Sequence, residues 1–452
     1  MNTKDVYKAY MYSYPHKTAY GKLDDVNLFD YLGTGDCLDL YVHIPFCKTK
    51  CGYCNLFSVT GWTELSVDGY LDAMERQISQ IGVNPSDIGN ITIGGGTPLY
   101  LSTKQLSRLF RMIPGIDASR ICVETAPNET VSEKLELLKY HNVNRVSIGI
   151  QSFLDSELGV LKRAHNSSAA HDAMAKIRDC DFDTVNVDLI YGIPNQTEKT
   201  LQASLEQTLA YAPNEIFLYP LYVREGTGLF GTVANPRAYE MYLFGRDYLA
   251  DKGYSQISMR HFVLEESAIT AGFKQYAKHS ISHRAGRGLA PAAARNCVEP
   301  ELSPSCGFER VLAIGCGGRS YLGDLHFCQP YATQEVRCSQ IIKEYIDTAD
   351  YTRVSHGIIL NTDEHKRRFA IKNLLHSHGL SRRAYREAFG SDPANDFSFL
   401  AELAAQGHTV MTDDFIRLTP VGLSLSDAIG PLFISPEMRK RMRCGLEARA
   451  PR

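Results

Sequence analysis

The chain of 452 residues is long enough for two or three domains, and its 44% hydrophobic content suffices for ordinary globular cores. Its 48 Lys and Arg residues nearly balance 51 Asp and Glu residues, so a net charge of -3 gives no overall attraction toward nucleic acid. No stretch approaches the roughly 18 consecutive apolar residues of a membrane span, and the first residues lack the apolar core of a signal peptide. We therefore expect a cytoplasmic protein without membrane contact.

Short β-branched runs alternate with amphipathic stretches along the first half of the chain. The strands expected from these runs cover residues 38–44, 90–94, 120–125, 145–150, 184–190 and 215–221. The helices expected between them cover residues 67–81, 102–112, 131–140, 168–179 and 198–210. Such alternation implies a parallel sheet with right-handed crossovers, and six units are too few for an eight-unit barrel. The sequence predicts an α/β fold built on a partial (β/α)6 barrel.

Three cysteines follow the first expected strand. Cys47, Cys51 and Cys54 lie in the run YVHIPFCKTKCGYC with the spacing C-x3-C-x2-C. Three thiolates can ligate only three irons of a [4Fe-4S] cluster, so the fourth iron is left open. An open iron can bind the amino and carboxylate groups of S-adenosylmethionine, whose reductive cleavage releases a 5′-deoxyadenosyl radical. A partial zinc site and three unrelated buried thiols are the alternatives for this spacing.

The position of the cysteines favours the cluster, because catalytic groups of barrel enzymes lie at the carboxyl ends of the strands. The other nine cysteines have no regular spacing, and in a reducing cytosol we expect them to be free thiols.

A glycine run and three polar residues stand at the ends of later strands. The run Gly94-Gly95-Gly96-Thr97-Pro98 could expose backbone amide groups to the amino acid part of S-adenosylmethionine, or it could be a tight turn. Glu124, Gln151 and Asp188 each lie at or near the end of a buried strand, where an unpartnered polar group costs a few kcal/mol. A bound ligand and a structural hydrogen bond are both possible partners.

The second half of the chain departs from this alternation. Residues 265–309 read as an insertion, and its basic stretch 282–295 could hold an anionic substrate or form a solvated loop. Three short helices are then expected at 364–376, 381–389 and 396–406, followed by a hairpin with strands at 408–411 and 415–418. Together they predict a winged-helix-like module, which could bind DNA or serve as a lid. We predict an N-terminal extension (1–37), the partial barrel (38–335) and a C-terminal domain (336–452).

Four segments together resemble the HemN-like branch of the radical S-adenosylmethionine superfamily. They are YVHIPFC at 41–47, GGGTP at 94–98, the stretch 145–153 and DLIYGIP at 188–194. The resemblance covers roughly residues 38–440, because DAIGP at 427–431 looks like part of the family's C-terminal domain. The branch includes oxygen-independent coproporphyrinogen III oxidases, haem chaperones, haem-degrading methyltransferases, and methylases and cyclopropanases.

The resemblance implies a role for individual residues. Cys47, Cys51 and Cys54 would ligate the [4Fe-4S] cluster. The resemblance implies two bound molecules of S-adenosylmethionine. It also implies that ten further residues lie at the cluster or bind these molecules: Tyr41, Tyr53, Gly95, Gly96, Thr97, Glu124, Gln151, Arg163, Asp188 and Tyr222. The glycine-rich stretch 315–321 would return to the active site, and residues 259–262 would vary with substrate.

One departure bears on the choice among members of this branch. Coproporphyrinogen oxidases carry a further cysteine two residues after the third ligand, where this chain has Leu56. Residues 55–58 and the tyrosine-rich start at 10–20 look instead like a subgroup near the methylases and cyclopropanases. The resemblance therefore implies radical methylation or cyclopropanation of a small-molecule substrate, with an electron from a reduced flavodoxin or ferredoxin. Oxidative decarboxylation of a porphyrinogen, a haem chaperone and, more distantly, DNA binding are the alternatives.

Overall fold

The computed structural model of the chain describes residues 6–7, 13–33, 37–115, 118, 120–233, 235–265, 310–330 and 332–447. The basic stretch predicted as a loop at 282–295 lies outside the described residues, as does almost all of the predicted insertion.

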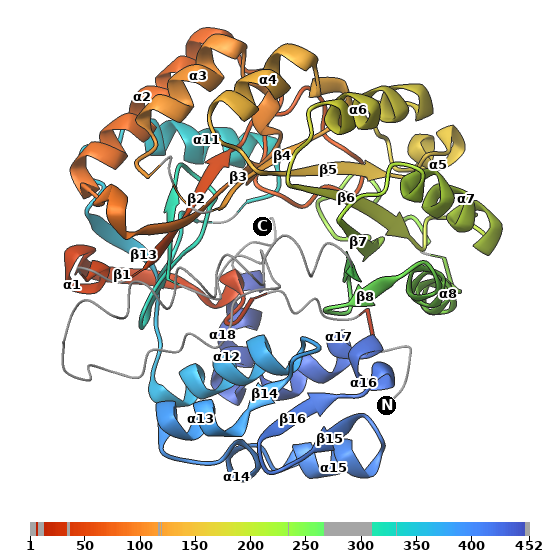
Figure 1. Cartoon of the computed structure of the whole chain (residues 1–452). Helices are drawn as coiled ribbons and strands as arrows, with labels where there is room; N and C mark the ends of the chain where they lie inside the picture. The colour runs from red at the N-terminus through yellow and green to blue at the C-terminus, as the bar shows by residue number, and fades with distance from the viewer. Residues whose placement is uncertain are drawn as a thin grey trace.

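Six parallel strands form the centre of the fold and follow one another in chain order. They are β2 (Leu38–Ile44), β3 (Ile88–Gly95), β4 (Arg120–Thr125), β5 (Arg145–Gln151), β6 (Thr184–Tyr191) and β7 (Glu215–Pro220). The connecting helices lie along the outer side of the curved sheet (Figure 1): α2 (Glu64–Ile81), α3 (Thr103–Met112), α4 (Ser132–Tyr140), α5 (Asp155–Val160), α6 (Ser167–Asp179) and α7 (Glu198–Leu209). The predicted partial (β/α)6 barrel is confirmed.

Further strands that the sequence did not predict extend this sheet to thirteen strands in the part of the chain that the structure describes. On the β7 side lie β9 (His261–Leu264) and β8 (Tyr254–Gln256), which follow α8 (Ala238–Asp251). On the β2 side the order is β10 (Val311–Ile314), β11 (Ser320–Leu322), β12 (Leu325–Phe327), β13 (Arg353–Ile359) and β1 (Gly21–Asn27). Within the described residues, β1 and β8 end the order without pairing to each other, so the barrel they build is open.

Burial alternates along the parallel strands. Side chains directed at the helices, such as Val42 and Val123, are fully buried. The register aligns Tyr41 with Thr92 and Asp188 with Phe217 on the opposite face, where all four side chains stay partly exposed. The inner face of the sheet is therefore only partly filled by side chains, which leaves room for ligands at its carboxyl edge.

The C-terminal part combines helices with a small antiparallel sheet of order β14-β16-β15. Its strands are β14 (Leu380–Ser381), β15 (Thr409–Met411) and β16 (Phe415–Leu418), and Figure 1 shows this part across the open side of the barrel. Its helices are α12 (Thr362–Leu374), α13 (Arg382–Phe389), α14 (Pro393–Asp396), α15 (Phe399–Ala405), α16 (Pro420–Ser424), α17 (Ser426–Ile429) and α18 (Pro436–Glu447). This arrangement agrees with the predicted winged-helix-like module.

The domain boundaries stay predictions. Two elements beyond residue 335 belong to the barrel side, since α11 (Glu335–Ile346) hydrogen-bonds with α2 and β13 pairs within the large sheet. Among the helices in the described ranges, none combines the length and apolarity needed to cross a bilayer.

Candidate functional site

The three predicted ligand cysteines lie on the loop that follows β2. The loop is pinned by backbone hydrogen bonds from Cys47 N to Val59 O (3.0 Å) and from Val59 N to Pro45 O (2.8 Å). Cys54 N donates to Cys51 O at 3.1 Å, which bends the second half of the loop. All three cysteines are partly exposed as residues, and none forms a disulfide.

The glycine run packs directly against this loop. Thr97 N donates to Phe46 O at 2.9 Å, and Thr97 Oγ1 lies 3.6 Å from Cys47 Sγ. A Cβ added to Gly96 would lie 2.9 Å from Cys47 Sγ and 2.8 Å from Phe46 O. The absence of a side chain at Gly96 therefore sets the distance between β3 and the cysteine loop.

One expectation about the glycine run needs correction. The N–H of Gly95 donates to Glu124 Oε2 at 3.2 Å, and the N–H of Gly96 donates to Ile44 O at 2.8 Å. These amides satisfy groups of the protein itself, so they are not the free donors that the sequence suggested.

Each cysteine has a polar neighbour of its own. Arg163 Nη1 donates to Cys51 Sγ at 3.1 Å, while Arg163 Nη2 donates to Gly149 O at 2.5 Å. Cys54 Sγ lies 3.9 Å from Ser58 Oγ. Burial raises the pKa of the Cys47 thiol to about 12 and also raises that of Cys54. Both are thus neutral thiols at pH 7 unless a bound cation favours the thiolate.

This donor set fits a [4Fe-4S] cluster. No three His, Cys, Asp or Glu side chains in the described ranges are placed to hold one metal ion. A [4Fe-4S] cluster makes a different demand, because each of its thiolate ligands binds a separate iron. Arg163 Nε, buried beside Cys51 and without a hydrogen-bond partner, further marks the loop as a place that receives a polar group.

Two carboxyl groups face the inner side of the barrel near the glycine run. Burial raises the pKa of Glu124 to about 7, and the nearby charge of Asp188 adds to the shift. Burial likewise raises the pKa of Asp188 to about 6, although a hydrogen bond from Asn186 Nδ2 (2.8 Å) opposes the shift. A ligand that donates hydrogen bonds would favour the ionised form of both groups.

Comparison with known proteins agrees with this geometry. Residues 41–208, which include the cysteine loop and both carboxyl groups, match the Radical SAM superfamily. In these residues the chain is similar to radical SAM enzymes.

Two relatives and one solved structure extend the similarity over most of the chain. The haem chaperone HemW of Bacillus subtilis is 27% identical over 414 residues, which cover 87% of this chain and 98% of the relative. The oxygen-independent coproporphyrinogen III oxidase of Synechocystis is 28% identical over 450 residues, which cover 93% and 91%. The solved coproporphyrinogen III oxidase (HemN) of Escherichia coli shares the fold, with a TM-score of 0.74, 23% identity and coverage of 94% and 96%.

The structure places the remaining predicted residues of the radical SAM site around the same loop and sheet edge. Gln151 ends β5 in the left-handed region (φ 71°), a strained conformation for a residue with a side chain. Tyr41 OH lies 3.2 Å from His43 Nδ1. Burial raises the pKa of Tyr53, which interacts with Arg163 and with Cys51. Tyr53 therefore lies in the cysteine loop, while Gln151 ends β5 and Tyr41 lies within β2, and the binding role of each stays a prediction.

Tyr222 differs from the other predicted residues because its hydroxyl group is engaged by the C-terminal part. It donates to Asp427 Oδ2 at 2.5 Å and accepts from Arg260 Nη2 at 2.9 Å. Whether Tyr222 also contacts S-adenosylmethionine stays a prediction.

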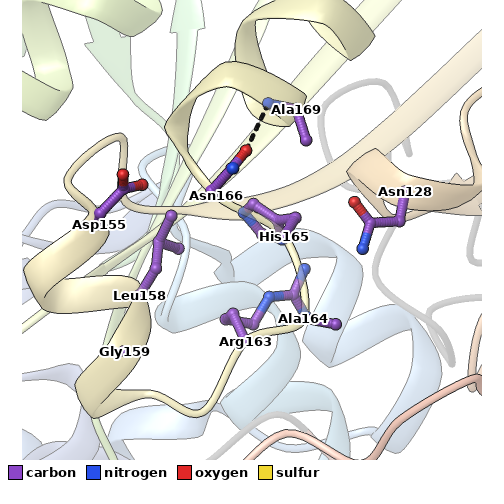
Figure 2. A pocket seen from close by; sticks show the side chains of 9 residues that line it. All are labelled: Asn128, Asp155, Leu158, Gly159, Arg163, Ala164, His165, Asn166 and Ala169. Atoms are coloured by element: carbon purple, nitrogen blue, oxygen red, sulfur yellow. Dashed lines mark hydrogen bonds between the residues drawn. The ribbon is translucent and has the colours of Figure 1, made fainter.

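A pocket of about 580 Å³ adjoins the radical SAM site on the other side of Arg163. Figure 2 shows that it is formed by α5, the loop that follows and the first turn of α6, and its lining residues are Asn128, Asp155, Leu158, Gly159, Arg163, Ala164, His165, Asn166 and Ala169. Asn166 caps α6 by accepting a hydrogen bond from Ala169 N at 2.9 Å. Arg163 thus lines this pocket and also bonds with Cys51.

Sequence reasoning missed two residues beside the site. Asn186 bridges Asp188 and Ser147 Oγ with its amide (both 2.8 Å), and strand alternation from Asp188 could have placed it on the inner face. Ser58 beside Cys54 had no such signal, because it lies in a loop without a period.

Proposed function

We propose that this protein binds a [4Fe-4S] cluster through Cys47, Cys51 and Cys54 and uses it to cleave S-adenosylmethionine reductively. The observation that carries the proposal is the packing of the glycine run against the cysteine loop, beside two carboxyl groups whose pKa is raised by burial. When bound, the cluster supplies one electron to the sulfonium, which gives methionine and a 5′-deoxyadenosyl radical.

The protein's own residues bind and orient the nucleotide in this proposal. Glu124 and Asp188 accept hydrogen bonds from its hydroxyl or amino groups, which offsets the cost of holding two buried carboxylates. Arg163 holds Cys51 with one nitrogen and the end of β5 with another, and so fixes the loop relative to the sheet. A second molecule of S-adenosylmethionine is required only if the reaction is a methylation, in which it would donate the methyl group.

We further propose that the organic ligand is a tetrapyrrole of haem metabolism. The relatives described above are named as haem chaperones and coproporphyrinogen oxidases, and none is named as a methylase. They support oxidative decarboxylation of a porphyrinogen propionate better than the methylation expected from the sequence. In that reaction the radical takes a hydrogen atom from the propionate, CO2 leaves, and an external acceptor takes the remaining electron.

A haem chaperone is the second candidate, favoured by a specific residue. Leu56, half exposed on the cysteine loop, stands where the sequence comparison expects a further cysteine in coproporphyrinogen oxidases. The similarity to the HemW relative also covers 98% of that protein. In this role the protein would bind haem and pass it on without consuming S-adenosylmethionine in each cycle.

Product analysis under strictly anaerobic conditions tests these proposals. The reconstituted protein is incubated with dithionite, S-adenosylmethionine and either coproporphyrinogen III or haem. Formation of 5′-deoxyadenosine supports the cleavage, and loss of CO2 from coproporphyrinogen III supports the decarboxylase. Stoichiometric haem binding without CO2 loss supports the chaperone. A methylated product together with S-adenosylhomocysteine would overturn both in favour of methyl transfer.

A further inference from the structure

The inner face of the large sheet continues past Tyr41 onto the short strands β10, β11 and β12. The register pairs Ala313 on β10 with Tyr41 on β2. Val311, two residues earlier on β10, pairs with Tyr321 on β11, which in turn pairs with His326 on β12. Paired residues of neighbouring strands point to the same face, as do residues two apart on one strand. Tyr321 and His326 therefore share the inner face with Tyr41.

Cationic side chains approach the two rings on β11 and β12. The Arg368 guanidinium group, on α12, lies 4.7 Å from the centroid of the Tyr321 ring, and that of Arg319 lies 5.9 Å from the same centroid. The His326 ring meets the Tyr321 ring edge to face at a centroid distance of 4.8 Å. Lys372, one turn after Arg368 on α12, also acts on His326 through its charge.

The N-terminal segment before β1 closes this group of side chains from a third direction. Arg319 Nη1 donates to Ser13 Oγ at 2.5 Å, and Arg368 Nη1 donates to Tyr14 O at 2.6 Å. Tyr20 is buried and interacts electrostatically with both arginines. We name the side chains that meet here the basic cluster: Tyr20, Arg319, Tyr321, His326, Arg368 and Lys372.

Two buried polar atoms of the basic cluster have no hydrogen-bond partner within the described ranges. They are Tyr20 Oη and His326 Nδ1, in residues that are 6% and 1% exposed. Because leaving such atoms unsatisfied is costly, folded proteins seldom do so unless a water molecule or a ligand binds there. Both atoms therefore point to a group that the basic cluster receives.

The charges of the basic cluster favour an anion over a water molecule at this place. Burial lowers the pKa of Arg368, and the charge of Arg319 adds to the shift. Burial also lowers the pKa of His326 well below its ordinary value, and the charges of Arg368, Lys372 and Arg319 lower it further. The cations of the basic cluster thus oppose one another. A neutral water molecule does not relieve this repulsion, whereas an anion does.

The basic cluster is continuous with the candidate active site through the glycine-rich stretch before Arg319. A Cβ added to Gly318 would lie 2.9 Å from Tyr41 Cδ1, so the glycine lets this stretch pack directly on the Tyr41 ring. Arg319 follows Gly318 and, like Arg368, stays partly exposed. The two arginines therefore extend the polar lining of the inner face beyond Tyr41.

From this arrangement we infer that the basic cluster binds a carboxylate group of the organic ligand. Planar guanidinium groups bind carboxylates through paired hydrogen bonds, and the Tyr20 hydroxyl group and the Nδ1–H tautomer of His326 supply two further donors. The inference rests on the proposed function, in which the ligand is a tetrapyrrole that carries propionate groups. A free oxyanion such as inorganic phosphate has the same hydrogen-bonding chemistry and is the alternative occupant.

Porphyrin binding to the full-length, cluster-loaded protein tests this inference. The probes are coproporphyrin III, which carries free propionate groups, and its neutral tetramethyl ester, both in the same detergent, with binding measured by fluorescence anisotropy. The variants are Arg319→Gln, Arg368→Gln and Tyr20→Phe, of which the last removes only the buried hydroxyl group. The matched controls are Arg353→Gln, at a side chain 51% exposed on β13, and Tyr140→Phe, at a residue 80% exposed on α4.

We expect each arginine variant of the basic cluster to weaken coproporphyrin III binding about tenfold and Tyr20→Phe to weaken it severalfold, with both controls within about twofold. The tetramethyl ester should bind the unchanged protein about tenfold more weakly than coproporphyrin III, and the variants should not weaken its binding further. Tyr20→Phe should not lower the melting temperature of the ligand-free protein, because it removes a buried hydroxyl group that the ligand alone satisfies.

Equal binding of coproporphyrin III by all these proteins would overturn the inference and leave the proposed tetrapyrrole function standing. A rise in melting temperature with inorganic phosphate that Arg319→Gln abolishes, together with unchanged porphyrin binding, would assign the basic cluster to a free anion and also overturn it. If the unchanged protein bound neither porphyrin, the tetrapyrrole proposal would fall and this inference with it. Tyr20→Phe keeps the buried ring, so it decides the inference if an arginine variant does not fold.

Discussion

At the scale of single residues, the account depends on buried carboxyl groups in the barrel interior. The pKa of Glu124 is about 7 in the folded protein, above its ordinary value of 4.5, because burial opposes ionisation. The folded protein is therefore most stable with respect to this group below about pH 4.5, where Glu124 is protonated in both the folded and the unfolded state. This stability is lost as the pH rises through 7 and the buried carboxyl group ionises. At neutral pH and above, the empty site thus carries a destabilising charge.

The variant Glu124→Gln should remove this pH dependence. An amide of similar shape can still accept the hydrogen bond from Gly95 N, but it does not ionise. We expect the free energy of unfolding of the cluster-free protein to rise by about 1–3 kcal/mol at pH 8 and to change little at pH 4.5. Urea unfolding at the two pH values measures the difference, with the exposed Glu133→Gln as a control. The same gain at both values would contradict burial as the cause.

The sequence predicted the positions of several polar residues of the candidate site, and the contacts it did not predict have a physical reason. Glu124, Gln151 and Asp188 were predictable because strand ends in parallel sheets meet at one edge. The contact between Arg163 and Cys51 joins residues 112 positions apart, and only the folded loop after α5 brings them together. The use of the Gly95 amide by Glu124 also depends on this tertiary packing.

At the scale of elements, the junction between β3 and the cysteine loop tolerates no side chain at Gly96. A Cβ there would come within 2.9 Å of the backbone carbonyl groups at Pro45 and Phe46 and of Cys47 Sγ, so the loop must shift. We expect Gly96→Ala to lower the iron content after reconstitution at least severalfold, because Cys47 is displaced. Iron and sulfide analysis of the anaerobic protein measures the effect.

A second glycine substitution is the control for this prediction. Gly69 lies in α2, where an added Cβ meets nothing within 4 Å. Gly69→Ala should keep the iron content and stabilise the helix by about 0.5–1 kcal/mol. If Gly96→Ala bound as much iron as Gly69→Ala, the loop would not need the close approach seen here.

The elements predicted well are those with enough residues to show a period. The expected strands at 38–44 and 120–125 coincide with β2 and β4, whose β-branched and other apolar residues are buried against helices. β10, β11 and β12 are only three or four residues long, and β10 pairs with the distant β2 as well as with β11. So short a run carries no alternation that distinguishes a strand from a loop.

At the scale of the whole molecule, a buried ion pair fastens the C-terminal part to the barrel. Asp427 on α17 is 1% exposed and bonds with both Arg260, between β8 and β9, and Tyr222 after β7. Asp427→Asn takes a carboxylate away from a buried guanidinium, so we expect the free energy of unfolding to fall by about 3–5 kcal/mol. Urea unfolding measures this loss, and faster proteolysis within the C-terminal part should accompany it.

The matched control is an exposed ion pair of the same kind. Asp25 and Arg353 lie 2.8 Å apart with side chains 82% and 51% exposed, so Asp25→Asn should cost about 0–1 kcal/mol. Similar losses for the two variants would mean that the contact between α17 and the barrel does not hold the parts together. The sequence did not predict this contact, since it joins residues 167 positions apart.

The central claim is that Cys47, Cys51 and Cys54 hold a [4Fe-4S] cluster that cleaves S-adenosylmethionine. The most direct test reconstitutes the unchanged protein and each Cys→Ala variant anaerobically, then measures iron, zinc and dithionite-driven 5′-deoxyadenosine, with Cys180→Ala as a control away from the loop. We predict about four irons per chain and cleavage in the unchanged protein and in Cys180→Ala, with cleavage lost in each of the other three variants. Stoichiometric zinc in place of iron, or cleavage that persists in those variants, would contradict the account.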